Sequence, residues 1–301
     1  VGSPGTGKTA FMAMLLRRLV DSGYSVAYIR DGVPLVSREH EELGIVLFYD
    51  DLPRMNVSAL SSIFRNNVRG IIATARVEEL RFVVDRTGFD PYDYFRVVEI
   101  PPMAPEHLRE MLLRYADAEG IRIADSSAID VVVSKAGGLP IYVWQVIREL
   151  RISGEPLTMD FANTIPKGMY DYIDDILWRI IGGVPERYEA LLTLLIMTDL
   201  AKYGIHQDLY SYVYLVAKEL RLKKKLSIRD VIFDEVLDNI TRYLARDATT
   251  FSFRLPHDSW ADVLRGKSNG PMAPEIAKIN MLYDGEERRK ILMKEGKFKI
   301  W

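Results

Sequence analysis

The chain has 301 residues, a size typical of about two domains, and 48% of them are hydrophobic, enough for a sizeable core. It has no cysteine, which excludes disulfides, thiolate metal sites and cysteine nucleophiles, and no apolar run long enough to span a membrane. The formal net charge of -2 gives no overall attraction to nucleic acid. With few glutamines and 27% charged residues, the composition leans towards a thermophile's protein, and we expect a cytoplasmic location.

The first nine residues carry the most specific motif of the chain. Gly2 to Thr9 read G-S-P-G-T-G-K-T, which fits the phosphate-binding P-loop, and an apolar helix is predicted from Ala10 to Leu19. Glycines let backbone N–H groups converge on an anion, which the helix N-terminus also favours. We expect Lys8 to reach the β- and γ-phosphates and the Thr9 hydroxyl to bind Mg²⁺. The nucleotide-binding residues expected here are Gly2, Ser3, Pro4, Gly5, Thr6, Gly7, Lys8, Thr9 and Ala10.

Short apolar segments alternate with helical ones through residues 1–103, which predicts an α/β ATPase core: a parallel sheet with helices on both faces. The four expected strands are 24–30, 44–49, 70–74 and 95–100. A P-loop normally follows a buried strand, whereas only Val1 precedes Gly2. We therefore expect an N-terminally truncated chain that lacks this leading strand and the residues that select the base.

Polar residues follow the second and third expected strands, at the edge of the sheet where the phosphates should lie. Asp50 and Asp51 end an apolar run in the Walker B arrangement: Asp50 is expected to hold Mg²⁺, and Asp51 to orient or deprotonate the attacking water. Thr74 and Arg76 end the third strand, where a hydroxyl or guanidinium can contact the γ-phosphate or the water. The two acids favour hydrolysis over binding alone.

The rest of the chain is predicted to be mainly helical. Three helices within 104–152, the first starting at Pro105, predict a small lid, and the segment 153–168 reads as an ordered connector. Four helices and then two strand-like pieces, 243–246 and 250–255, predict a winged-helix domain over 169–269. The four helices are expected near 169–181, 185–202, 207–222 and 228–244. A charged tail, 270–301, should add a helix.

This order of motifs resembles the STAND branch of the AAA+ ATPases, which includes NB-ARC proteins and archaeal relatives. The resemblance is carried by the P-loop, Asp50-Asp51, Thr74-Ala75-Arg76 and Gly137-Gly138-Leu139-Pro140. It implies that Pro140 packs on the adenine. Leu255-Pro256-His257-Asp258 is similar to the family's Met-His-Asp signature, which implies that His257 touches the β-phosphate of ADP, with Asp258 as its helix-capping neighbour. The chain departs from ordinary AAA+ proteins because no arginine follows Pro140 at the second sensor position.

Together these features predict an ATP hydrolase that acts as a molecular switch, using ATP/ADP and Mg²⁺, with a lid and winged helix that close over ADP. Hydrolysis should be slow without a partner or self-assembly. Besides nucleotide, the expected interactions are self-association through the ATPase domain and a protein partner; no membrane is expected.

Two alternatives stay open. The first is a replication-initiator-like or transposition-helper AAA+ ATPase that grips duplex DNA through the winged helix; the basic run 221–225 supports it. DNA is nevertheless the less favoured partner, because the candidate recognition helix carries Asp230, Asp234, Glu235 and Asp238, which repel a phosphate backbone. The second is a scaffold that keeps nucleotide without hydrolysing it, and Asp51 argues against it.

Overall fold

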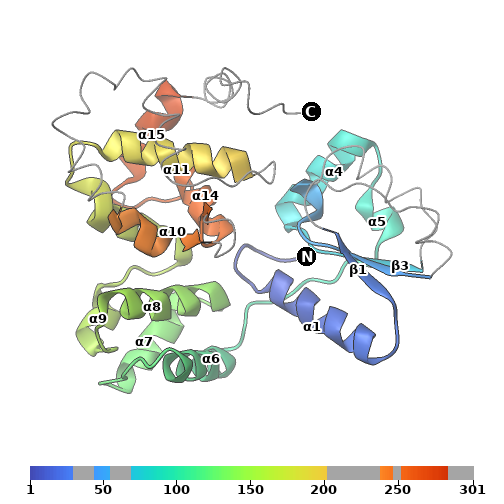
Figure 1. Ribbon diagram of the computed structural model, residues 1–301, viewed down its shortest axis with the longest axis horizontal. Helices are drawn as coiled ribbons and strands as arrows, with labels where there is room; N and C mark the ends of the chain where they lie inside the picture. Colours follow the sequence, from blue (N-terminus) through green and yellow to red (C-terminus); the bar gives the residue numbers. More distant parts are fainter. Residues whose placement is uncertain (30–43, 55–68, 202–237, 247–251, 284–301) are drawn as a thin grey trace. The chain divides into compact units, whose positions relative to one another are not determined.

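The computed structural model describes residues 1–29, 44–54, 69–201, 238–246 and 252–283 (Figure 1). The chain divides into two compact units. The first unit is Val1–Met111 with Gly138–Val143, and the second is Leu112–Gly137 with Trp144–Trp301. None of the helices in the described ranges is long and apolar enough to cross a membrane.

The first unit contains a parallel sheet of three strands, β1 (Val26–Ile29), β2 (Val46–Tyr49) and β3 (Gly70–Ala73), in the order β1-β2-β3. Three of the four expected strands are thus confirmed. Val46 pairs with Val26 on one side and with Gly70 on the other, so the three strands end level with one another. The residues that follow β2 and β3 therefore meet at one edge of the sheet.

The central strand β2 is buried on both faces, which explains its unbroken apolar sequence. On one face Val46 and Phe48 pack with Met12 of helix α1 (Lys8–Asp21). On the other face Leu47 and Tyr49 cluster with Leu52, the first residue of a short 3-10 helix, η1 (Leu52–Arg54). The two faces of β2 thus fix α1 and the segment after β2 relative to the strand ends.

The fourth expected strand, 95–100, is not a strand in the structure. The N-terminal amine of Val1 donates to the Val98 carbonyl (2.6 Å), and the Ile100 N–H donates to the Val1 carbonyl (2.8 Å). On its other side, the Gly2 N–H donates to the carbonyl of Ala75, just beyond β3 (3.3 Å). The segment thus runs beside Val1, but the bonds to one residue do not make the continuous ladder that defines a strand. It follows three short helices, η2 (Val77–Glu79), α4 (Leu80–Thr87) and α5 (Pro91–Tyr94).

Three helices form where the sequence predicts a lid: α6 (Pro105–Ala118), α7 (Ser127–Ala136) and α8 (Pro140–Ser153). A short helix, α9 (Met159–Thr164), lies inside the expected connector, and the Thr158 hydroxyl accepts a hydrogen bond from the Phe161 N–H at its start. Helix α10 (Met169–Leu177) continues into a π-helical turn, η3 (Trp178–Gly182), and α11 (Arg187–Ala201) follows.

The C-terminal part of the second unit contains an antiparallel pair, β4 (Ala245–Arg246) and β5 (Phe253–Arg254), at the place of the expected hairpin. Helices α14 (Asp258–Leu264) and α15 (Ala273–Leu282) follow. Most of the two helices expected near 207–222 and 228–244, and the expected tail beyond 283, lie outside the described residues.

A buried carboxylate on α10 holds the loop between α14 and α15. Asp174 is fully buried; its carboxylate accepts hydrogen bonds from the Ser268 hydroxyl (2.6 Å) and the Met272 N–H (2.7 Å). Nearby, Asp171 accepts from the Asn269 N–H (3.0 Å). Burial raises the pKa of Asp174 above its usual value, and the two hydrogen bonds oppose this shift without cancelling it.

We predict that Asp174→Asn becomes more stable relative to wild type as the pH rises. A buried acid with a raised pKa favours its protonated form, so its full contribution is present below about pH 4 and is lost as the pH rises through the folded-state pKa. The Asn amide can still accept from the Met272 N–H and donate to the Ser268 hydroxyl, and it carries no charge. Urea unfolding of both proteins between pH 4 and 8 measures the difference. In contrast, Asp174→Ala should be less stable than wild type by about 2–4 kcal/mol at pH 4, where the wild-type carboxyl contributes most, because both donors lose their acceptor.

Candidate functional site: a phosphate loop beside two acids

The loop before α1 needs glycine at two positions. Gly5 and Gly7 have φ angles of 82° and 88°, in the left-handed region that other residues rarely adopt. A Cβ on Gly5 would also overlap the Ile141 side chain. The loop is braced internally, since the Thr6 hydroxyl donates to the Ser3 carbonyl (2.9 Å). The glycines of the motif are thus required by the shape of the loop.

The loop leads into a helix N-terminus that can receive an anion. Gly7 is the N-cap of α1, and no residue of the first helical turn is acidic. The first amides of a helix lack partners within the helix, and its dipole places partial positive charge there. The Lys8 ammonium lies over the same loop and donates to the carbonyls of Gly2 and Ser3 (both 2.9 Å). Positive charge and N–H donors therefore gather where the sequence predicts a phosphate.

Asp50 joins the start of α1 to the ends of two strands. Its carboxylate accepts from the Thr9 hydroxyl (3.0 and 3.2 Å to the two oxygens) and from the Thr74 hydroxyl (2.5 Å). Burial raises the pKa of the preceding Tyr49 side chain to about 12, so that the phenol stays neutral next to the acids. Thr9 and Asp50, expected from the sequence to share a metal ion, are thus brought into direct contact.

Asp51 has an unusual backbone. It is the one non-glycine residue of the described chain with a positive φ, 60°. Its N–H donates to the Thr74 hydroxyl (2.8 Å), while the next N–H, of Leu52, donates to the Thr74 carbonyl (2.8 Å). A left-handed aspartate costs about 1 kcal/mol or more and persists only where its surroundings hold it. Thr74, itself buried, supplies this restraint.

The Thr74 hydroxyl therefore acts on both acids at once, donating to Asp50 and accepting from the Asp51 N–H. The contacts formed here are those of a residue that positions the acids. The expected contact of Thr74 with the γ-phosphate or the attacking water stays a prediction. The sequence indicates that Asp50 and Thr74 each follow a strand, but not that they lie side by side. The β2–β3 register, which pairs Tyr49 with Ala73, shows that they do.

We predict that Thr74→Val lowers the rate of ATP hydrolysis by about tenfold or more, while nucleotide affinity changes by less than about threefold. Valine keeps the shape of threonine but removes the donor to Asp50 and the acceptor for the Asp51 N–H. Thr74→Ser keeps the hydroxyl and is the matched control, which should retain most of the activity. Steady-state turnover and equilibrium nucleotide binding, measured on the three proteins, separate the two quantities. Equal turnover in Thr74→Val and Thr74→Ser would contradict the positioning role.

Arg76 also lies just beyond β3 and is buried, with 4% of its surface exposed. Arg76 is the N-cap of η2, and one of its guanidinium nitrogens lies 3.7 Å from a carboxylate oxygen of Glu79, the last residue of that helix. The expected contact of Arg76 with the γ-phosphate stays a prediction. Glu79 was not predicted from the sequence to be part of the site. Its position three residues after Arg76 is the spacing at which an acid and a base pair on a helix, and this spacing could have indicated the ion pair.

The residues Gly138-Leu139-Pro140 of the predicted lid turn belong to the first unit, as does the phosphate loop before α1. The turn lies beside that loop. The Met103 N–H donates to the Gly138 carbonyl (2.8 Å), and the Ile141 N–H donates to the Gly5 carbonyl (3.4 Å). Pro140 is the first residue of α8, a position that proline favours. The structure thus brings together two motifs that are far apart in the sequence, and the contact of Pro140 with adenine stays a prediction.

His257 belongs to the second unit, where it caps α14. Its Nδ1 accepts the Ser259 N–H (3.1 Å) and lies 3.0 Å from the Ser259 hydroxyl. The expected capping neighbour, Asp258, is instead the first residue of the helix. When Nδ1 accepts in a neutral imidazole, the proton is on Nε2, which is then a donor of the kind that an anionic phosphate accepts.

The residues at the loop fit Mg²⁺ as a partner of phosphate. Thr9 and Asp50 offer two oxygen ligands in contact with each other, and Mg²⁺ prefers oxygen, usually from one or two protein groups together with phosphates and water. Among the described residues, no group of three or more His, Cys, Asp or Glu could hold a metal ion. When bound, Mg²⁺ would neutralise charge that develops on the phosphates.

No protein-family model and no curated protein matches the sequence. Solved structures that the chain is similar to include the RuvB Holliday junction branch migration motor of Thermotoga maritima, at 16% identity and a TM-score of 0.37, covering 87% of this chain and 85% of that one. Another is the ORC2 protein of Aeropyrum pernix in its ADP form, at 12% identity and a TM-score of 0.40, covering 93% and 86%. Both likenesses are distant.

Proposed function

We propose that the chain binds ATP and hydrolyses it slowly, as a STAND-type AAA+ molecular switch. The observation that carries this proposal is the meeting of Thr9, Asp50 and Thr74 beside the phosphate loop, through hydrogen bonds of 2.5–3.2 Å. Three segments distant in the sequence supply these groups. The proposal is supported because P-loop NTPases hold Mg²⁺ with a P-loop Ser or Thr and a Walker B Asp, the residue types of Thr9 and Asp50. A glycine-rich turn with a structural role alone would not need the two hydroxyls and the acid to converge.

Each residue of the site has a proposed task. Lys8 and the loop N–H groups hold the β- and γ-phosphates, and Thr9 with Asp50 holds Mg²⁺. Asp51 orients the attacking water or takes its proton, with its geometry maintained by Thr74. Arg76 stabilises negative charge on the γ-phosphate, which distinguishes ATP from ADP.

The switch itself needs the lid and the C-terminal region. We propose the domain organisation 1–103 for the ATPase core, 104–152 for the lid, 153–168 for the connector, 169–269 for a winged helix and 270–301 for the tail. Pro140 packs on the base, and His257 contacts the β-phosphate of ADP in the closed form. A ligand shifts a conformational equilibrium only by its difference in affinity for the two states, and these contacts supply that difference.

A selective loss of ADP affinity in His257→Ala tests the switch. We expect weaker ADP binding by about tenfold, with ATP affinity changed by less than about threefold, because a hydrogen bond to a charged group contributes about 1.5 kcal/mol or more. The control is His107→Ala, which removes an exposed imidazole from α6. Equal losses for both nucleotides, or no loss at all, would contradict the proposed contact.

The alternative is an AAA+ ATPase that binds duplex DNA through the C-terminal region. The observation that favours it is the β4–β5 pair, on which Arg246 and Arg254 are both exposed. Binding of a DNA duplex that weakens steeply with salt, and that Arg246→Gln with Arg254→Gln reduces, would support this alternative over the switch. The switch predicts no binding at physiological salt, with or without ATP.

A further inference from the structure

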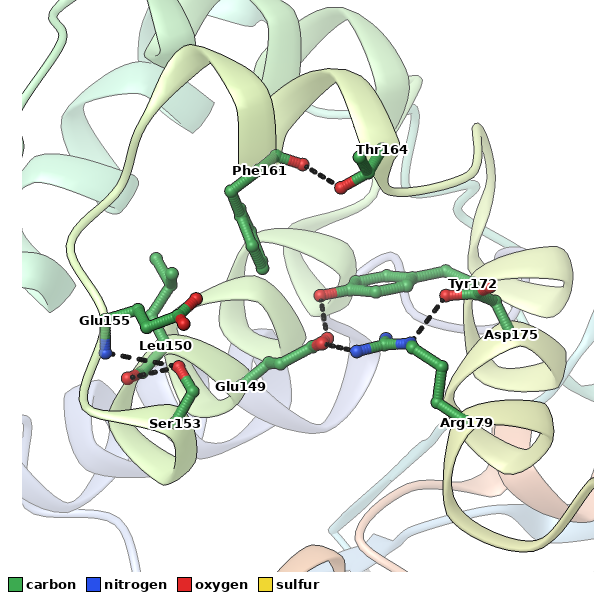
Figure 2. A network of polar contacts seen from close by, with 9 residues as sticks. All are labelled: Glu149, Leu150, Ser153, Glu155, Phe161, Thr164, Tyr172, Asp175 and Arg179. Atoms are coloured by element: carbon green, nitrogen blue, oxygen red, sulfur yellow. Dashed lines mark hydrogen bonds and ion pairs between the residues drawn. The ribbon is translucent and has the colours of Figure 1, made fainter. Parts of the chain in front are cut away.

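A buried carboxylate in the second unit connects helix α8 to helix α10 and the turn η3. Glu149 of α8 is 3% exposed; one of its oxygens accepts the Tyr172 hydroxyl (2.5 Å), and the other pairs with the Arg179 guanidinium (Figure 2). Arg179 is itself oriented by Asp175, one turn earlier, which accepts from its Nε (2.9 Å). A single acid of the lid thus receives hydrogen bonds from two residues beyond the connector.

The Glu149–Arg179 pair favours one packing of α8 against α10 and η3 more than it raises the folding stability of the protein. Burial alone would lower the pKa of Arg179, but the hydrogen bond and charge of Glu149 outweigh this effect and raise it. Removing the partner of a buried charge is strongly destabilising, whereas replacing both partners by apolar residues is often neutral. Of this pair, Glu149 is the buried member and Arg179 is 44% exposed. The pair therefore penalises any packing of α8 that leaves Glu149 buried without its partner.

The cluster borders a cavity of about 370 Å³. Arg179, whose side chain is 44% exposed, lines this cavity together with Glu149, Phe161 and Tyr243. Asp175 pairs with the Nε of the same guanidinium (2.9 Å), which keeps Arg179 oriented towards the buried Glu149.

Two further side chains join the lid to the segments that follow it. The Lys135 ammonium at the end of α7 donates to the carbonyls of Ala162, Asn163 and Ile165 (2.6–2.8 Å), using all three of its hydrogens at the C-terminus of α9. A guanidinium nitrogen of Arg148, beside Glu149 in α8, donates to the Leu244 carbonyl (2.8 Å). The lid is therefore fastened at three separate points, each through a charged side chain.

We propose that the Glu149–Tyr172–Arg179 cluster makes the lid helices and the C-terminal helices one rigid body, which moves as a whole when the nucleotide changes. The role in nucleotide response rests on the proposed function, whereas the rigidity is a property of the second unit alone. The Gly-Leu-Pro turn lies at the start of the same helix that carries Glu149, and the Ile141 N–H of its first turn donates to the Gly5 carbonyl of the loop before α1 (3.4 Å). Movement of that turn would accordingly be transmitted to α10 without a hinge at the connector.

Distance measurements between two spin labels test this rigidity. The chain has no cysteine, so Tyr115→Cys on α6 and Met281→Cys on α15, both at exposed positions of the second unit, accept labels without background. We expect one narrow distance distribution in the nucleotide-free protein, unchanged by ADP or ATP. A broad distribution in the nucleotide-free protein, or a distance that shifts between ADP and ATP, would overturn the proposal.

Two variants of the labelled protein identify the cluster as the cause. Glu149→Gln should at least double the width of the distribution, and the double change Glu149→Met with Arg179→Met, which leaves no buried charge unpaired, should do the same in a protein that stays folded. The matched control is Glu119→Gln, which breaks the exposed ion pair of Glu119 with Arg151 (2.9 Å) in the same unit and should leave the width unchanged. An unchanged width in the folded double variant would overturn the proposal.

The same experiment separates the two proposals. Lack of nucleotide binding would remove the proposed function, while the nucleotide-free distances would still show whether the cluster locks the lid.

Discussion

Lys8→Ala is expected to weaken ATP and ADP binding by about 100-fold or more. The ammonium lies over the loop carbonyls of Gly2 and Ser3 at 2.9 Å, in the position from which it can turn to the phosphates. A charge-assisted hydrogen bond contributes about 1.5–3 kcal/mol, and the loss of the positive charge also weakens the attraction of the loop for a polyanion. Equilibrium titration with a fluorescent ATP analogue measures the change.

The matched control is Arg17→Ala, which removes a cation from the same helix at a position where the side chain is 85% exposed. The global charge then changes equally in the two variants, and only Lys8→Ala should lose affinity. Unchanged ATP binding in a folded Lys8→Ala protein would contradict the phosphate role of the loop.

Asp51→Asn is expected to reduce hydrolysis by about 10²–10⁴-fold while nucleotide binding is retained. Asparagine fits the left-handed backbone at φ 60° and keeps the N–H that donates to Thr74, so the turn should stay intact. What the change removes is the charge and the basicity needed to orient the water or accept its proton. Single-turnover hydrolysis and nucleotide binding, measured on the same samples, give the two quantities separately.

Asp50→Asn provides a useful contrast to Asp51→Asn. It alters the carboxylate that contacts the Thr9 hydroxyl, so we expect the dependence of binding on Mg²⁺ to weaken along with turnover. If Asp51→Asn hydrolysed ATP at the wild-type rate, the chain would match instead the non-hydrolysing scaffold that the sequence left open.

The phosphate loop and the strands beside it could be predicted because their signals are local. The glycines at positions 5 and 7 are needed for positive φ angles, and the apolar run of β2 reflects burial on both faces of one strand. The segment 95–100 has the same local signal as the true strands. It is not a strand because a strand depends on a partner, and within the described part of the chain its ladder bonds reach only Val1.

The finer features of the site depend on tertiary pairing and could not be read from local patterns. The left-handed Asp51 and the double role of Thr74 follow from the β2–β3 register, which a single sequence does not specify. The Glu149 cluster is harder still to predict. Its members follow no sequence motif and come together only because α8 packs against α10 and η3. Helical periodicity predicts which residues are buried, but not which buried acid finds a partner.

The most direct test of the central claim is calorimetric titration of the wild-type chain with ATP and with ADP, in the presence and absence of Mg²⁺. We expect one nucleotide per chain, with ATP affinity raised by Mg²⁺, since the loop binds the phosphates and Thr9 with Asp50 binds the metal. Absence of binding at millimolar nucleotide in a folded sample would contradict the claim, and so would binding that Lys8→Ala leaves unchanged.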